Sequence, residues 1–247
     1  MKHIRFTLLI FSLLSFTSLS FVGLASASSR GKIQTFADAK RLLKQNLELF
    51  DHRTIYCGCL VKGKQIDLKS CGYKVQTDAK RAARMEWEHV VPAQAFGQSF
   101  VEWRESSPKC KKGSRQFKGR KCAETNPIFQ KMEADLYNLF PEIGELNGLR
   151  NNFSMAALTG SQYDFGDCKA KIEDKKFEPM DFAKGIVART YLNFEHQYPG
   201  HGVISNKNEK LFEAWNKTYP ITELECKRWK ALEPKQGYRH LFASQCR

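Results

Sequence analysis

The sequence predicts a single exported domain of the α+β class, in which several helices surround a few short strands. Three observations support this prediction. Apolar residues recur at helical spacing in some segments and form short strand-like runs in others. Eight cysteines follow an N-terminal leader. No internal repeat and no long low-complexity linker divides the chain, so one disulfide-stabilised domain accounts for the exported part.

The N-terminus has the organisation of a secretory signal peptide. Lys2 and Arg5 precede an apolar stretch that runs to Leu24, and the small residues Ala-Ser-Ala close it at Ala27. Ser and Thr interrupt this stretch, which argues against a retained membrane span, and no other apolar run reaches the roughly 18 residues that a span requires. We expect cleavage near Ala27, a mature chain of residues 28–247 that does not bind the membrane, and a periplasmic or secreted location.

The chain is strongly basic. Its formal net charge is +14, and the loss of Lys2 and Arg5 with the signal peptide leaves +12 on the mature chain. A positive charge of this size favours an anionic polymer as partner, with nucleic acid ahead of acidic glycans and membrane surfaces. A basic surface that serves only solubility is the alternative.

All eight cysteines lie after the signal peptide, and an even number in an exported chain predicts four disulfides. A structural zinc site is the alternative, but the sequence has no Cys-x2-Cys pair, and a single residue separates Cys57 from Cys59. We predict a local loop closure between Cys110 and Cys122. We also expect Cys59 and Cys71 to staple the region around them.

The mature chain is expected to begin with an amphipathic helix at residues 35–50, where apolar residues recur three and four positions apart. Two short strands are expected next, at 54–57 and 66–68, around a turn at Lys62-Gly63-Lys64. A further strand is expected from Met85 to Val91, and Pro92 ends it.

The middle of the chain is expected to alternate helix and strand around a loop at residues 109–121 that is dense in Lys, Arg and Gly. A short helix is expected at 93–96, and residues 100–103 continue it. A helix at 128–136, a strand at 137–140 and a helix at 141–152 with Pro141 in its first turn are expected after the loop.

The C-terminal part is expected to be helical, after a loop at 164–174. Phe182 and Phe194 mark one apolar stripe, and Trp215 belongs to a second. A third helix is expected to begin at Thr222, because the Thr-x-x-Glu spacing to Glu225 is a capping box. We expect these stripes to pack in the core.

A Glu-His pair lies near the end of the strand predicted at 85–91. Side chains alternate along a strand, so Glu88 and His89 point to opposite faces until the strand ends or twists. Such a pair can offer a carboxylate to a metal ion and an imidazole to a water molecule. The alternative is an ordinary amphipathic strand with a solvated Glu and a hydrogen-bonded His, since short motifs often match by chance.

The other polar residues narrow the possible chemistry. The sequence has no Gly-x-Ser-x-Gly elbow and no Gly-rich phosphate loop, and disulfide pairing consumes the thiols that nucleophilic catalysis needs. Carboxylate and amide oxygens suit Mg²⁺ or Ca²⁺, and the sequence offers them at Glu88, Glu133, Asn138 and Asn147. The neutral imidazole of His89 beside such a site can serve as a general base. No organic cofactor is expected.

Several segments together resemble the bacterial endonuclease I family of periplasmic and secreted non-specific DNases. They are RMEWEHVVPA at 84–93, KMEADLYNL at 131–139 and GELNGLRN at 144–151. The shorter matches YCGC at 56–59 and FEAWNK at 212–217 extend the resemblance over nearly all of the mature chain.

The resemblance implies a mixed fold around a ββα-metal motif, one divalent ion, and cleavage of DNA and often RNA to 5′-phosphate ends. Glu88 and Asn147 match the metal ligands of the family, and His89 matches its general base. Arg120 matches an arginine that holds the scissile phosphate, and Glu133 matches an acidic residue near the site. The ion is expected to be Mg²⁺, with Ca²⁺ or Mn²⁺ as alternatives.

Two segments depart from the family pattern. The basic loop is spaced differently, so Arg115 is an alternative to Arg120 at the scissile phosphate, and the tail at 237–240 lacks the expected Asn-rich sequence. The residues expected to contact the nucleic-acid backbone are Arg84, Arg115, Lys118 and Arg150.

We therefore expect an enzyme that acts as a monomer on double- and single-stranded DNA, and on RNA. Contacts with backbone phosphates give strong salt dependence without sequence preference. The alternative from another class is an exported basic module that binds DNA or acidic glycans without chemistry. A sequence-specific nuclease is less favoured, because the sequence has no separate recognition module. A protein inhibitor could restrain such a nuclease before export.

Overall fold

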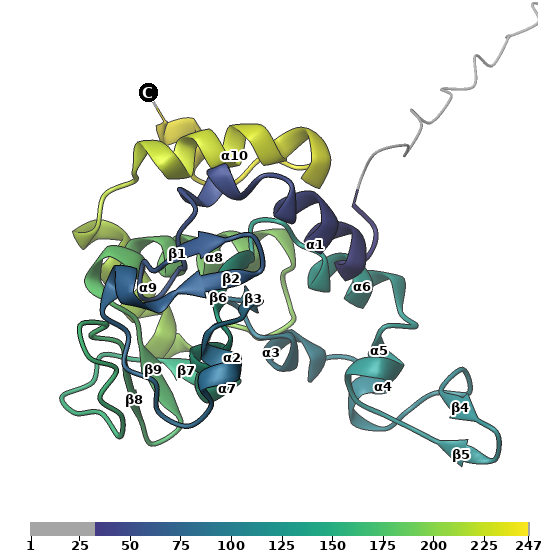
Figure 1. The fold of residues 1–247 in the computed structure, drawn as a ribbon. Coiled ribbons are helices and arrows are strands. Elements are labelled where there is room, and N and C mark those ends of the chain that lie inside the picture. The colour runs from purple at the N-terminus through teal and green to yellow at the C-terminus, as the bar shows by residue number, and fades with distance from the viewer. Residues whose placement is uncertain (1–32, 247) are drawn as a thin grey trace, which may run out of the picture. The chain divides into compact units, whose positions relative to one another are not determined.

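A two-stranded antiparallel ribbon carries the Glu-His pair (Figure 1). The computed structural model describes residues 33–246, so the predicted signal peptide at 1–27 lies outside the described residues. The expected strand is present as β3 (Met85–His89), and it pairs with β6 (Leu139–Ile143). His89 lies opposite Leu139, and every residue of β6 is buried. The ribbon therefore anchors the pair in the interior of the fold.

The expectation that Pro141 opens a helix is wrong. Pro141 is a strand residue opposite Trp87, and the helix α7 runs only from Gly144 to Arg150. Proline lacks a backbone N–H, and β6 tolerates it because this strand has a single strand partner. The strands β3 and β6 and the helix α7 together form the ββα arrangement that the resemblance implied.

Close packing explains the glycines of α7, a helix that these residues weaken by propensity. A Cβ atom at Gly144 would lie 2.5 Å from the backbone oxygen of Arg81, and one at Gly148 would collide with the Arg81 guanidinium. The absence of side chains at these two positions thus lets α7 lie close to α2 (Ala79–Ala82).

The helix expected at 35–50 is divided into two pieces. The helix α1 (Phe36–Lys44) begins at the N-cap Thr35, and a separate 3-10 turn spans Leu47–Phe50. Between them, the Asn46 side chain donates to the carbonyl of Leu42 at 2.7 Å, which closes the end of α1. A side-chain bond of this kind competes with continuation of the helix.

The strand expected at 54–57 is also wrong, because this segment is a turn. The carbonyl and hydroxyl of Thr54 accept from the N–H groups of Gly58 and Cys59 at 3.1 and 3.0 Å. The strands β1 (Leu60–Lys62) and β2 (Gln65–Asp67) follow and pair around Gly63-Lys64, so the predicted hairpin turn is confirmed.

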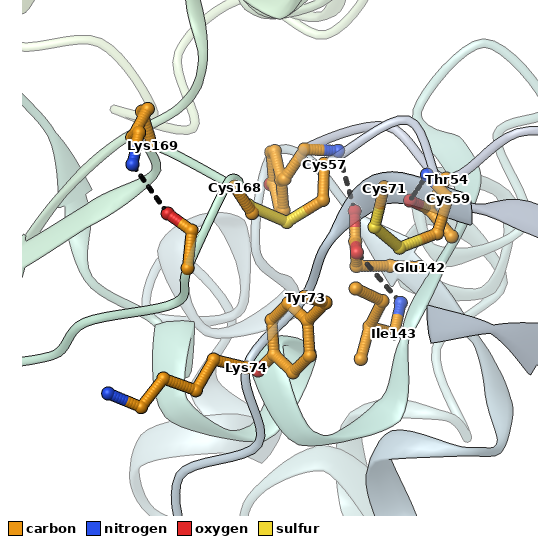
Figure 2. Close-up of a disulfide and its surroundings, with 12 residues drawn as sticks. Thr54, Cys57, Cys59, Cys71, Tyr73, Lys74, Glu142, Ile143, Cys168 and Lys169 are labelled. Atoms are coloured by element: carbon orange, nitrogen blue, oxygen red, sulfur yellow. Dashed lines mark hydrogen bonds between the residues drawn. A yellow bond between two sulfur atoms is a disulfide. The ribbon is translucent and has the colours of Figure 1, made fainter. Parts of the chain in front are cut away.

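Four disulfides close the fold, and they include the predicted pair Cys110–Cys122. The pairs are Cys57–Cys168, Cys59–Cys71, Cys110–Cys122 and Cys226–Cys246. All eight cysteines are consumed, which removes the zinc alternative. Figure 2 shows the Glu142 carboxylate in the region of the first two disulfides; it accepts from the N–H groups of Tyr56 and Ile143, both at 2.7 Å.

Three long helices supply much of the core. They are α8 (Asp181–Gln197), α9 (Asn206–Thr218) and α10 (Glu223–Gln236). The rings of Tyr191 and Phe212 stack with centroids 4.4 Å apart, which joins α8 to α9. The capping box of Thr222 with Glu225 is confirmed. Phe182 departs from the predicted core stripe, since its side chain is exposed.

The remaining elements are short and connect these parts. They are η2 (Leu68–Cys71), α3 (Ala93–Gly97), α4 (Val101–Arg104), β4 (Lys111–Lys112), β5 (Arg115–Gln116), α5 (Arg120–Ala123), α6 (Pro127–Glu133), β7 (Ser154–Met155), β8 (Lys171–Glu173), β9 (Lys176–Glu178) and η3 (Ala243–Gln245). Among residues 33–246, no helix is both long enough and apolar enough to cross a membrane.

Candidate functional site

A pocket of about 750 Å³ lies between β3, α7, α1 and the start of α5. Four of the five residues predicted to act in catalysis or to bind the metal line it, namely Glu88, His89, Arg120 and Asn147, and Arg150 lines it as well. They come from three separate stretches of the chain, which the fold brings to one cavity. The fifth, Glu133, does not line the pocket. Its carboxylate accepts from Arg120 and its backbone carbonyl accepts from His89, and both of these residues do line the pocket.

Glu88 is held by one of its two carboxylate oxygens. Oε1 accepts from the Tyr56 hydroxyl at 2.7 Å and lies 3.1 Å from Nη1 of Arg150. Oε2 has no hydrogen-bond donor among residues 33–246, and it remains accessible from the pocket. Burial raises the pKa of Glu88, and the positive charge of Arg150 opposes this shift. Tyr56 and Arg150 thus orient the carboxylate through Oε1, which leaves Oε2 for a ligand.

Arg150 is buried, although we expected it to contact the nucleic-acid backbone. Its side chain is 1 % exposed. Its guanidinium faces Glu88 and donates to the carbonyls of Val90 at 2.8 Å and His89 at 3.3 Å. These contacts tie α7 to the end of β3. The arrangement replaces the expected surface contact with an interior one, because both Nη groups already donate to backbone carbonyls of the protein.

The tautomer of His89 follows from its partner. Nε2 lies 2.8 Å from the backbone carbonyl oxygen of Glu133. A carbonyl can only accept a hydrogen bond, so Nε2 carries the proton and Nδ1 keeps a free lone pair. Burial, together with the nearby positive charge of Arg120, lowers the pKa of His89 to about 3. The imidazole is therefore neutral at neutral pH and has one basic nitrogen.

Arg120 and Glu133 form an ion pair at the wall of the pocket. Arg120 Nε donates to Glu133 Oε1 at 2.5 Å, and the guanidinium lies 5.2 Å from the ring centroid of Phe36. Glu133 is buried, whereas 41 % of the Arg120 side chain is exposed. Arg115 lies in the exposed hairpin and does not line the pocket. The structure thus places Arg120, and not the alternative Arg115, at the cavity.

Asn147 is oriented by Glu86, a residue that the sequence analysis did not assign. Nδ2 of Asn147 donates to Glu86 Oε2 at 3.3 Å. Glu86 also accepts from Arg81 at 2.9 and 3.1 Å and from Arg84 at 2.7 Å. Glu86 lies two positions before Glu88 on β3, so strand alternation places both on one face. That alternation was the signal that could have identified Glu86 in advance.

The two basic residues Arg84 and Lys118 remain available at the surface. The Arg84 side chain is 58 % exposed despite its ion pair with Glu86, and Lys118 is exposed beside the hairpin. Tyr56, by contrast, is buried and holds Glu88. Tyr56 lies in a segment that resembles the family, yet nothing local in the sequence indicated its partner.

The pocket offers oxygen ligands that fit a hard divalent cation. Oε2 of Glu88 and Oδ1 of Asn147 are free of protein donors among the described residues. Within residues 33–246, no group of three or more His, Cys, Asp and Glu side chains is placed to hold a metal ion. A site with one carboxylate and one amide is suited to Mg²⁺, which keeps several waters when bound.

The family model of endonuclease I matches residues 39–246, a range that contains every lining residue of the pocket except Phe36. The chain belongs to the endonuclease I family. An endonuclease-1 of Buchnera aphidicola subsp. Acyrthosiphon pisum (strain APS) is 39 % identical over 201 residues, which cover 76 % of this chain and 75 % of the relative.

Two relatives of this endonuclease I family member come from Aeromonas hydrophila. One is an extracellular deoxyribonuclease, 38 % identical over 86 % of this chain and 91 % of the relative. The other is a periplasmic deoxyribonuclease, 38 % identical over 86 % of this chain and 87 % of the relative. The predicted family membership is therefore confirmed.

Proposed function

We propose that this endonuclease I family member is a periplasmic or extracellular endonuclease that hydrolyses DNA without sequence preference, and RNA as well, to 5′-phosphate ends. The observation that carries the proposal is the convergence of Glu88, His89, Arg120 and Asn147 on one pocket of a strongly basic chain. The deoxyribonuclease names of the relatives support DNA as the substrate.

His89 is the general base in this proposal. Its Nδ1 takes a proton from a water molecule, and the water oxygen attacks phosphorus in line with the bond to the 3′-oxygen. That bond breaks, and the 3′-oxygen takes a proton from solvent water to become the 3′-hydroxyl of one fragment. The phosphate remains on the 5′ end of the other fragment. Nε2 donates to the carbonyl of Glu133, 2.8 Å away, so Nδ1 is the nitrogen left to accept the proton of the water.

Glu88 and Asn147 would hold the divalent cation, with Mg²⁺ preferred and Ca²⁺ or Mn²⁺ as alternatives. When bound, the cation supplies charge stabilisation for the phosphate and the leaving oxygen. Tyr56 and Arg150 fix the Glu88 carboxylate from behind, and Glu86 fixes the Asn147 amide. These partners reduce the reorganisation that the site needs when it binds its ligand.

Arg120 binds the scissile phosphate in this proposal. Glu133 holds Nε of its guanidinium, which leaves the two Nη groups to donate to phosphate oxygens. Arg84, Arg115 and Lys118 contact backbone phosphates away from the cleaved bond. Phosphate contacts of this kind carry no sequence information, which accounts for non-specific cleavage.

Plasmid nicking with added Mg²⁺ and with EDTA tests the proposal. Wild-type protein is expected to convert supercoiled DNA to nicked and then fragmented DNA with Mg²⁺ and to leave it intact with EDTA. A basic binding module would shift the DNA in a gel without nicking it. Discrete fragments in place of a smear would indicate a sequence-specific enzyme.

A further inference from the structure

A basic hairpin extends from the base of the pocket. Residues 109–119, which we call the basic arm, contain five Lys or Arg and no Asp or Glu. Lys111 pairs with Gln116 and Lys112 with Arg115, and the turn includes Gly113 at a φ of 63°. Figure 1 shows β4 and β5 standing away from the other elements. The arm therefore presents a concentrated positive charge outside the pocket.

The base of the arm is firmly attached to the fold. The disulfide Cys110–Cys122 joins the start of the arm to α5, which follows the arm, with the Cα atoms 5.3 Å apart. Phe117 N–H donates to the carbonyl of Cys110 at 3.0 Å, and Gly119 N–H donates to that of Trp103 at 3.0 Å. Arg120, which lines the pocket, follows the arm directly. The arm and the pocket thus share one rigid junction.

The charges of the arm are not neutralised within the protein. Lys111, Lys112, Arg115 and Lys118 are all exposed. None of the four has an ion-pair partner in the part of the chain that the structure describes. Like charges held close together on one short hairpin repel, and an anionic polymer relieves that repulsion.

We propose that the basic arm is a second binding site, which grips backbone phosphates of duplex DNA away from the scissile bond. The proposal rests on the proposed function and adds a substrate class to it, namely duplexes long enough to reach both the pocket and the arm. A strand rises about 3.3 Å per residue, so the three residues from Cys110 to Gly113 extend by about 10 Å. That distance corresponds to about three base pairs at about 3.4 Å each.

The composition of the arm favours duplex DNA over single strands. Proteins that hold single strands combine a basic groove with exposed aromatic rings on which bases stack. The one aromatic residue of the arm, Phe117, is half-buried, and its carbonyl accepts from the Ser106 hydroxyl at 2.5 Å at the base of the arm. The tip therefore offers cations alone, which suits the high phosphate density of a duplex.

A comparison of two fourfold variants tests this proposal. The arm variant carries Lys111→Ser, Lys112→Ser, Arg115→Ser and Lys118→Ser. The control carries Lys207→Ser, Lys210→Ser, Lys217→Ser and Lys230→Ser, which remove the same charge from exposed positions on α9 and α10. Neither helix contributes a residue to the pocket.

Binding and cleavage are measured on a duplex of about 40 base pairs, and the salt dependence of binding is recorded. Cleavage is also measured on the dinucleotide thymidylyl-thymidine, which is too short to reach the arm. The arm variant is expected to bind the long duplex at least about tenfold more weakly, with a salt slope smaller by up to about 3.6 for four lost phosphate contacts. Cleavage of the dinucleotide and hydrolysis of thymidine 5′-phosphate p-nitrophenyl ester should stay at the wild-type level, and the control should match wild type throughout.

Three outcomes would overturn the proposal. An equal loss in the control would mean that total charge, and not the arm, sets affinity. An equal loss of cleavage on the dinucleotide and on the duplex would place the arm in the cleavage site. A larger loss on single-stranded DNA or RNA would contradict the duplex assignment. Binding is also measured in EDTA, where no cleavage is expected, so the arm is tested independently of catalysis. Failure of wild-type protein to cleave with Mg²⁺ would overturn the proposed function without deciding the role of the arm in binding.

Discussion

Asn147 on α7 donates from Nδ2 to Oε2 of Glu86 on β3, at 3.3 Å, across 61 positions of the chain. The amide has one oxygen and one nitrogen, and this bond commits the nitrogen to the protein. The oxygen is left for the pocket. Arg81 and Arg84 hold Glu86 in turn, so the orientation of the Asn147 ligand depends on an acid that is itself fixed by two cations.

Glu86→Gln is therefore expected to weaken the binding of the divalent cation about 10- to 100-fold, the usual cost of losing a partner that orients a ligand. The variant loses the charged acceptor that Asn147 and both arginines share. The measurement is the rise in melting temperature on titration with Mg²⁺ or Mn²⁺, which does not depend on cleavage. Glu223→Gln, on the exposed start of α10, is the matched control, and unchanged cation affinity in Glu86→Gln would contradict the assignment.

His89→Ala should abolish most cleavage and leave DNA binding largely intact. Loss of a positioned general base is expected to lower kcat about 10²- to 10⁴-fold. His196→Ala, at an exposed position near the end of α8, should behave as wild type. Single-turnover cleavage rates and gel-shift affinities measure the two properties separately. Near-wild-type cleavage by His89→Ala would remove His89 from the proposed mechanism.

Arg150→Met is expected to destabilise the fold by about 3 to 5 kcal/mol, because it leaves the buried Glu88 carboxylate without its cation. The side chains of both residues are almost completely buried, so solvent screens their interaction little. The double variant Arg150→Met with Glu88→Gln should recover much of this loss and remain inactive. Urea denaturation of the two single variants and the double variant measures the coupling. Additive effects would show that the pair does not interact strongly.

His240 should make the protein sensitive to acid. Its ring stacks on Trp229 with centroids 4.0 Å apart, and its Nδ1 accepts from Phe242 N–H at 3.3 Å. Burial, and the positive charges of Arg228 and Arg189, lower its pKa from 6.5 to about 2. Below pH 6.5 the imidazole of His240 therefore binds a proton in the unfolded chain and stays neutral in the folded chain. The contribution of this neutral imidazole to the free energy of unfolding is complete above pH 6.5. As the pH falls towards 2, the free energy of unfolding decreases by up to about 1.4 kcal/mol per pH unit.

His240→Asn removes this titration and keeps an acceptor for Phe242. We expect a flatter dependence of the free energy of unfolding on pH between about 6 and 4. The exposed His196→Asn serves as the control and should keep the wild-type slope. Urea denaturation across this pH range measures both. An unchanged slope in His240→Asn would mean that the ring is protonated in the folded state.

Features that depend on residues close together in the chain were predictable from the sequence. The strand that carries Glu88 and His89 is an example, since alternation and the following proline mark it. The capping box at Thr222 is another, with Glu225 N–H donating to the Thr222 hydroxyl at 3.2 Å. The local disulfide Cys110–Cys122 and the hairpin turn after Lys62 belong to the same class.

The wrong predictions occur where distant partners override local preference. Residues 54–57 have the composition of a strand, yet Tyr56 N–H donates to Glu142, 86 positions away, and Cys57 is joined to Cys168, 111 positions away. Pro141 has a good local fit to the first turn of a helix, but pairing with β3 places it in a strand. Local propensity is worth a fraction of a kcal/mol per residue, and buried pairing and cross-links outweigh it.

The sequence alone predicted export, and it determined that this is a disulfide-bonded chain of the endonuclease I family with a Glu-His pair at the end of a strand. The tertiary structure decided how the pair is supported. It buried Arg150 against Glu88, brought Tyr56 to the same carboxylate, and placed Glu86 beside Asn147. The reason is physical: these contacts join residues 32, 61 and 62 positions apart, and periodicity within a helix or strand carries no information about separations of that length.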